Sequence, residues 1–263
     1  MRLTAVAATA LTAAVLTGLA PSPAMAGSYP IKDRRLTHNA LYGTGQFPAS
    51  ACRVAPPADR GHAAVRAYLT TTYTCLNTAW GRHLRTHGLP GAKPSFAYLT
   101  RPDAPFCQGK AADIMPGAYC NPTGAIGVYL PGPVREYAPE VGFLLVMAHE
   151  YGHHVQRLTG VLQGAAQERY TSKAHVLEAQ RRYELQADCL AGVYIGSVWD
   201  AQKRSVPEWG TLIAIAWSLG GEKGSKANDH GSRANRARWF NRGFAAESPA
   251  ACNTWTAAPD RVA

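Results

Sequence analysis

A short apolar stretch with the pattern His-Glu-x-x-His limits the fold and chemistry of this chain more than any other feature. The stretch begins at Phe143, and His149, Glu150 and His153 follow within it. Residues four apart share a face of an α-helix, so the two imidazoles can point at one metal ion with Glu150 beside them. This arrangement is typical of zinc sites in which the glutamate is a general base. The stretch therefore predicts a helix that carries a zinc site.

A chance occurrence of the pattern is the alternative, because the spacing alone is only suggestive. The residues immediately before it, Phe143 to Ala148, are all apolar. Two imidazoles and a carboxylate are unfavourable to bury in such a run without partners, and a metal ion supplies a partner. We therefore favour a site for one Zn²⁺ over an accidental match.

The N-terminus has the composition of an export signal. Met1-Arg2 precedes an apolar, Ala-rich run, and Ala24-Met25-Ala26 has the small-residue pattern of a cleavage site. An uncleaved membrane anchor is the alternative, but the Ala and Thr content makes the run weakly hydrophobic. We expect residues 1–26 to be a signal peptide, and the mature protein to be secreted without a transmembrane segment.

The positive net charge of the chain indicates which kinds of partner it could bind. The formal net charge is +10, and removing the signal peptide takes away Arg2 and leaves +9. Such an excess favours anionic surfaces such as those of the cell envelope, although a solvated basic surface without a partner is the simpler interpretation. The one local basic cluster lacks an aromatic platform: Arg233, Arg236, Arg238 and Arg242. We therefore expect no nucleic-acid partner.

Six cysteines are present, an even number that favours disulfides in an exported chain. The sequence contains no C-x-x-C pair, which disfavours zinc ligation by cysteine. Sequence alone does not choose among the possible pairings. Chain order suggests Cys52–Cys75, Cys107–Cys120 and Cys189–Cys252.

Hydrophobic periodicity predicts a mostly helical α+β domain. Apolar residues at helical spacing predict helices over residues 62–87, 139–158, 172–199, 207–221 and 233–243. Two short runs, 95–100 and 127–130, read as strands. Residues 27–57 show little periodicity and are expected to form an extended N-terminal segment, followed by one domain over 58–263.

The sequence also predicts structural roles for two further residues of the central helix. Gly152 weakens the helix by about 1 kcal/mol relative to Ala, which is reasonable if another element approaches the backbone there. His154 does not share the face of His149 and His153. We expect it to be a hydrogen-bonded core or supporting histidine rather than a metal ligand.

A catalytic zinc needs a third protein ligand and an open position. The pattern in which a third histidine follows on the same segment is excluded, because Gln156 and Thr159 occupy the required Gly and His positions. A glutamate from a later helix is the remaining common solution. Glu184 fits it, and Asp188 four residues on could bond the far nitrogen of a zinc histidine. A solvated helix face is the alternative for this pair.

Three motifs together resemble the neutral zinc metallopeptidase family, within the gluzincin-like group. The motifs are Ala148 to Gln156, Glu184 to Gly192, and His230-Gly231-Ser232 through Arg236 to Phe240. The resemblance implies a zincin-like fold: an active-site helix, a Glu-donating helix and a small β-sheet whose edge strand receives substrate. By position, that edge strand would be Gly127 to Leu130.

Function follows as a set of hypotheses. The leading one is a secreted zinc peptidase acting on peptide or protein, with Glu150 as base and His230 donating a hydrogen bond to the developing oxyanion. For His230, a histidine near a helix start without chemistry is the alternative. For the protein, the alternatives are a non-enzymatic envelope-binding protein with a structural zinc, and a zinc hydrolase of a wall amide or ester.

Overall fold

The computed structural model describes residues 31–222 and 228–263, and the expected signal peptide lies outside the described residues. The α-helices are α1 (Arg34–Thr37), α2 (His62–Thr86), α3 (Gly132–Tyr137), α4 (Glu140–Leu158), α5 (Val161–Gln167), α6 (Lys173–Val198), α7 (Val206–Ser218) and α8 (Arg233–Ala246). The strands are β1 (Ser95–Leu99), β2 (Pro105–Phe106), β3 (Gly109–Lys110), β4 (Gly117–Cys120) and β5 (Ala125–Tyr129). The predicted mostly helical α+β class is confirmed.

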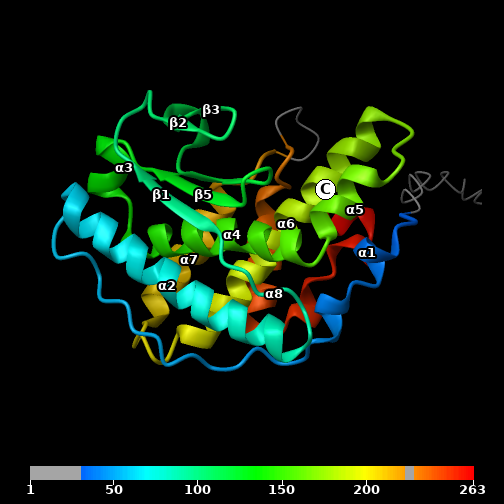
Figure 1. Cartoon of the computed structure of the whole chain (residues 1–263), viewed down its shortest axis with the longest axis horizontal. Coiled ribbons are helices and arrows are strands. Elements are labelled where there is room, and N and C mark those ends of the chain that lie inside the picture. The colour runs from blue at the N-terminus through cyan, green and yellow to red at the C-terminus, as the bar shows by residue number, and fades with distance from the viewer. Residues whose placement is uncertain (1–30, 223–227) are drawn as a thin grey trace, which may run out of the picture.

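The elements are stacked in layers around α4 (Figure 1). One side of α4 packs against the sheet, its other side packs against α6, and α6 in turn packs along α8. Apolar residues on both central helices are fully buried between these layers, including Leu144, Met147, Leu190 and Tyr194. Most residues of the helix that carries the His-Glu-x-x-His pattern are thus buried.

The sheet has the strand order β1-β5-β4. β1 pairs with β5 in parallel, and β4 pairs with β5 antiparallel. The expectation that Gly127 to Leu130 forms the edge strand is wrong, because β5 has a hydrogen-bonded neighbour on each side. The edge next to α4 is β4, which lies between the two segments predicted as strands and was not itself predicted.

Glycines allow the central helices to approach closely. A Cβ on Gly152 would lie 3.0 Å from the carbonyl oxygen of Ala187 in α6, so the predicted close approach is confirmed. At the next layer, a Cβ on Gly243 of α8 would lie 1.9 Å from the carbonyl oxygen of Cys189. Position 243 therefore accepts no side chain larger than hydrogen unless α6 or α8 shifts.

The three predicted disulfides are all present: Cys52–Cys75, Cys107–Cys120 and Cys189–Cys252. They tie the N-terminal segment to α2, close the loop that ends in β4, and join α6 to the C-terminal turns. The N-terminal segment includes the short helix α1 and buries Leu41 and Phe47 in the main core. No helix in the described part of the chain is both long and apolar enough to span a membrane.

Candidate metal centre

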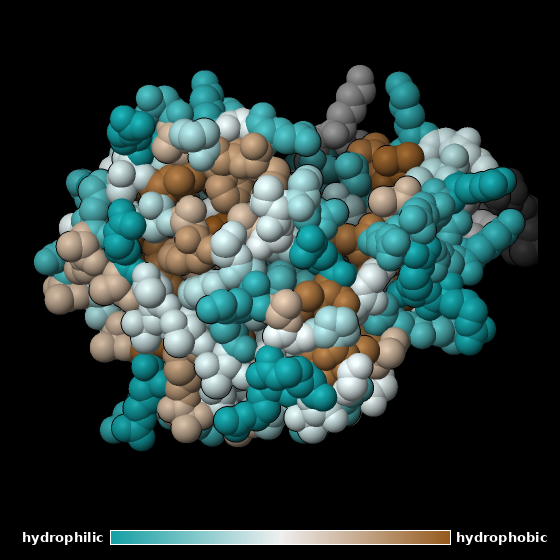
Figure 2. All heavy atoms as spheres, viewed as in Figure 1, coloured by the Kyte–Doolittle hydropathy of each residue, from teal (hydrophilic) through white to brown (hydrophobic). Residues whose placement is uncertain are grey.

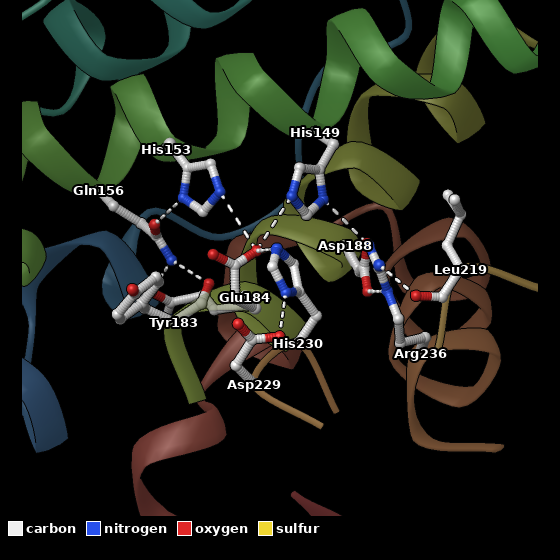
Figure 3. Close-up of polar contacts among 11 residues, drawn as sticks. His149, His153, Gln156, Tyr183, Glu184, Asp188, Leu219, Asp229, His230 and Arg236 are labelled. Atoms are coloured by element: carbon white, nitrogen blue, oxygen red, sulfur yellow. Dashed lines mark hydrogen bonds and ion pairs between the residues drawn. The ribbon is translucent and has the colours of Figure 1, made fainter. Parts of the chain in front are cut away.

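Three side chains from α4 and α6 converge on one point (Figure 3). Nε2 of His149 lies 3.2 Å, and Nε2 of His153 3.4 Å, from Oε2 of Glu184. Their ligand atoms all lie within 4.8 Å of one another, and the three residues are buried. The spacing of four residues brings the histidines to one face of α4, and α6 supplies the carboxylate opposite.

Asp188 fixes the orientation of His149. Its Oδ1 lies 2.9 Å from Nδ1 of His149, and its two oxygens accept bonds of 2.8 Å from the guanidinium of Arg236. An ionised carboxylate only accepts hydrogen bonds, so Nδ1 of His149 carries a proton. The other nitrogen of the ring, Nε2, faces Oε2 of Glu184 at 3.2 Å and is the nitrogen that a metal ion could bind in place of a proton.

Gln156 does the same for His153. The Oε1 atom of Gln156 lies 2.9 Å from Nδ1 of His153. The orientation of this amide follows from its other end, where Nε2 donates to the carbonyl of Tyr183 and to Oε1 of Gln186. Oε1 of Gln156 is consequently the acceptor and Nδ1 of His153 is the donor, so Nε2 of His153 is the nitrogen that faces Glu184 and could bind a metal ion.

The pKa shifts at the centre indicate that it favours bound positive charge. Burial by itself lowers the pKa of His149, yet Asp188 and Glu184 outweigh it and raise that pKa to about 10. Burial raises the pKa of Glu184, but His153 and His149 hold it well below its usual value. A positive charge is thus strongly favoured among these acceptors. Two imidazole nitrogens and one carboxylate oxygen form a donor set that fits zinc.

Glu150 lies beside this group without joining it. The side chain is buried, and burial raises the pKa of its carboxyl, an effect that the neighbouring His149 opposes. Glu150 lines the cavities on both sides of the centre. A carboxylate in this position can exchange a proton with a molecule bound at the centre.

A cleft crosses the metal centre. One cavity of about 530 Å³ and a smaller one of about 220 Å³ share four lining residues: Gly117, His149, Glu150 and His230. The edge strand β4 contributes Gly117, Ala118 and Tyr119 to the larger cavity. Val176 near the start of α6 is 40% exposed and lines this cavity, because α6 begins beyond the core and borders the cleft.

His230 approaches the centre from the turn before α8. Its Nε2 lies 3.6 Å from Oε2 of Glu184, and its Nδ1 lies 2.7 Å from Oδ1 of Asp229 (Figure 3). Unlike the other two histidines it is exposed, and it is not part of the three-residue ligand group found among the described residues. The ring therefore faces the open side of the centre.

His154 turns away from the metal centre. It is buried, its Nδ1 lies 3.0 Å from the hydroxyl of Tyr119, and its Nε2 lies 2.7 Å from the carbonyl of Ala92. The prediction of a hydrogen-bonded core histidine is confirmed. The contact with Tyr119 joins the edge strand β4 to α4.

Two supporting residues had no role assigned from the sequence. Gln156 follows His153 by three positions on the same helix, so helical spacing alone could have indicated the contact. Arg236 lies in α8, 48 residues after Asp188, and no local pattern indicates that pairing. Only the packing of α8 along α6 brings the two charges together.

His149, His153 and Glu184 form a possible metal site of two histidines and one glutamate on α4 and α6, with the carboxylate of Asp188 next to the first histidine. Residues 136–255 match the family described as "putative neutral zinc metallopeptidase". The resemblance deduced from the motifs is confirmed.

Relatives extend this similarity over more of the chain. The protein YpfJ of Escherichia coli K12 is 29% identical over 224 residues, which cover 77% of this chain and 74% of YpfJ. The protein Rv2575 of Mycobacterium tuberculosis H37Rv is 38% identical over 132 residues, 43% of this chain and 44% of Rv2575. Both bear the name "uncharacterized protein". The comparison with solved structures found no match.

Proposed function

We propose that the protein is a secreted zinc metallopeptidase that hydrolyses peptide bonds with Glu150 as general base. One observation carries the proposal: the Nδ1 atoms of His149 and His153 both donate to acceptors, so both Nε2 atoms converge on Glu184 beside a second buried carboxylate, that of Glu150. The family match over residues 136–255 supports the same activity.

His149, His153 and Glu184 would hold one zinc ion, with Asp188 and Gln156 orienting the two imidazoles. A zinc ion held by these residues would lower the pKa of a bound water molecule and polarise a substrate carbonyl. A structural zinc would instead be closed by four ligands and would leave no task for a free carboxylate such as Glu150.

Glu150 moves the proton. Its carboxylate accepts a proton from the attacking water as the water oxygen bonds to the carbonyl carbon of the substrate. The same carboxyl then gives that proton to the amine nitrogen as the C–N bond breaks, so Glu150 is first base and then acid. Burial, which raises the pKa of this carboxyl, brings its proton affinity closer to what both steps need.

The edge strand and His230 would bind the substrate backbone. β4 has a free edge beside the centre, where an extended peptide can pair with its backbone N–H and C=O groups. His230 would donate from Nε2 to the carbonyl oxygen as that oxygen gains negative charge. Because Nδ1 bonds Asp229, donation from Nε2 requires a ring that carries both protons.

Compartment and surface partners remain proposals as well. Three disulfides suit an oxidising environment, which agrees with export through the N-terminal segment. Contact with an anionic envelope surface stays a prediction from the net charge alone.

Replacement of Glu150 by Gln tests the mechanism. We expect Glu150→Gln to keep one equivalent of zinc and the native fold but to lose turnover by on the order of 10²-fold or more, because an amide cannot accept the proton. Cleavage of a peptide library and metal analysis on the same samples measure both quantities. His149→Ala should lose zinc and activity together, and Glu136→Gln on the exposed helix α3 is the matched control.

Turnover by Glu150→Gln at close to the wild-type rate, with zinc still at one equivalent, would show that Glu150 is not the base. The structural-zinc hypothesis would then be the better account.

A further inference from the structure

The larger cavity has an apolar wall away from the metal centre. Near α5 and the beginning of α6 its lining includes Tyr170 and Gln180 but is mostly small or aliphatic: Leu162, Ala165, Ala166, Val176 and Ala179. Figure 2 shows hydrophobic surface beside these elements, at the upper right. The described residues that line this cavity carry charged or imidazole groups only at the metal centre and at His230 beside it. The wall near α5 therefore offers no partner for a charged ligand.

The smaller cavity on the other side of the centre has a different character. Its volume is about 220 Å³, and its walls include Met115 and Leu219 together with the buried ion pair of Asp188 and Arg236. It has less than half the volume of the cavity near α5. A bulky side chain therefore fits one side of the centre much better than the other.

The direction of β4 decides which end of a substrate meets which cavity. Met115 and Pro116, just before β4, line only the smaller cavity, whereas Tyr119 and Asn121 line only the larger one. The strand thus runs from the small cavity to the large one. Antiparallel pairing is the commoner and slightly more stable mode, and it places the N-terminal half of a bound peptide over the larger cavity.

We infer that the larger cavity selects a large apolar side chain on the carbonyl side of the scissile bond, while the smaller cavity takes a small residue on the amine side. This inference rests on the proposed peptidase function. Phe, Tyr, Leu and Met have the size and polarity that the wall of α5 and α6 accommodates. In an apolar pocket, each added methylene of the substrate changes kcat/KM by roughly 10- to 200-fold. We therefore expect kcat/KM for Phe to exceed that for Ala on the order of 10²-fold.

Defined peptides test the preference. Three decapeptides share a central Ala and differ only in the residue before it, which is Phe in the first, Ala in the second and Glu in the third. A fourth decapeptide has Phe after the central Ala instead of before it. Wild-type protein with zinc should cleave the first with kcat/KM at least tenfold above the others, and mass spectrometry of the products should locate the cut after Phe. Affinities of Glu150→Gln for the same peptides, from fluorescence anisotropy, should follow the same order.

A cavity-filling variant tests the location. Ala166 is exposed and lines the cavity, so Ala166→Trp fills it without disturbing the core and should bring the Phe-to-Ala ratio of kcat/KM close to one. Gln163→Trp is the matched control, because Gln163 is exposed on the same helix but does not line the cavity. Val176→Lys should raise kcat/KM for the Glu peptide at least tenfold.

The outcomes separate this inference from the proposed function. Cleavage with equal rates for all peptides, or a preference on the amine side, overturns the inference and leaves the peptidase function intact. Tighter binding of the Phe peptide by Glu150→Gln without cleavage by the wild type supports the larger cavity as a site for a large apolar side chain and contradicts the proposed function. Equal binding of all four peptides without cleavage overturns both.

Discussion

His230 is the residue whose proposed role depends most on its exposed position. It meets the centre from the turn before α8, with Asp229 on its far nitrogen, whereas the two proposed ligand histidines lie buried on α4. A group that faces the open side can bind a substrate oxygen without being needed to hold the metal. Its removal should therefore separate catalysis from metal binding.

We predict that His230→Ala lowers kcat by on the order of 10²-fold or more and leaves zinc content unchanged, since loss of one oxyanion donor typically has an effect of this size. Steady-state kinetics with metal analysis provide the measurement. His38→Ala, in an exposed position on the N-terminal segment, is the control. Loss of zinc in His230→Ala would mean that this ring is a ligand, and an unchanged kcat would mean that it has no catalytic role.

The contact between α6 and α8 is the element-scale feature on which the centre depends. Asp188 on α6 is paired with Arg236 on α8, and the same two helices touch at Gly243, where a Cβ would come within 1.9 Å of a carbonyl oxygen. Close packing thus holds the guanidinium against the carboxylate that orients His149. Any increase in the helix separation should weaken both stability and zinc affinity.

Two glycine substitutions test this packing in opposite directions. Gly243→Ala should destabilise the protein by about 1–3 kcal/mol, because overpacking forces backbone shifts. Gly210→Ala, on the exposed side of α7 with no atom within 4 Å of the new Cβ, should stabilise it by up to about 1 kcal/mol through helix propensity. Urea denaturation of both variants measures the difference, and a neutral Gly243→Ala would show that the helices are not tightly held.

Local patterns predicted the long helices and the proposed ligand histidines well, because periodicity of 3.6 residues and the His-Glu-x-x-His spacing are short-range properties. The edge strand was not predictable in the same way. Gly117 to Cys120 is a short Gly- and Ala-containing segment, and its position at the sheet edge follows from its pairing with β5. The pairing of Asp188 with Arg236 likewise depends on the packing of α8, which no local pattern encodes.

At the scale of the whole molecule, the N-terminal segment is fastened across the domain. Cys52 is bonded to Cys75 of α2, Phe47 packs against Trp80 and His83, and the hydroxyl of Thr44 contacts Nε2 of His83 at 2.9 Å. His83 is buried, and burial with the nearby His87 lowers its pKa to about 4. The segment therefore packs against a histidine that is neutral in the folded protein.

This histidine should make stability depend on pH. In the unfolded chain its pKa is about 6.5, so the neutral folded form is fully favoured above that pH, and the advantage is lost as pH falls towards 4. We predict that the wild type loses on the order of 2–3 kcal/mol more than His83→Gln between pH 7 and pH 4. Urea denaturation at both pH values measures this loss, with His38→Gln as the exposed control, and equal losses in all three proteins would contradict it.

The most direct test of the account is the coordination of the metal in the purified wild-type protein. Zinc analysis combined with X-ray absorption at the zinc edge should find one equivalent of zinc, bound by two imidazole nitrogens and by oxygen at about 2.0–2.2 Å, with water among the ligands. The oxygen contribution should fall on Glu184→Ala. A protein without zinc, a site with sulfur at about 2.3 Å, or a closed site of four protein ligands would contradict the assignment of His149, His153 and Glu184 as an open catalytic centre.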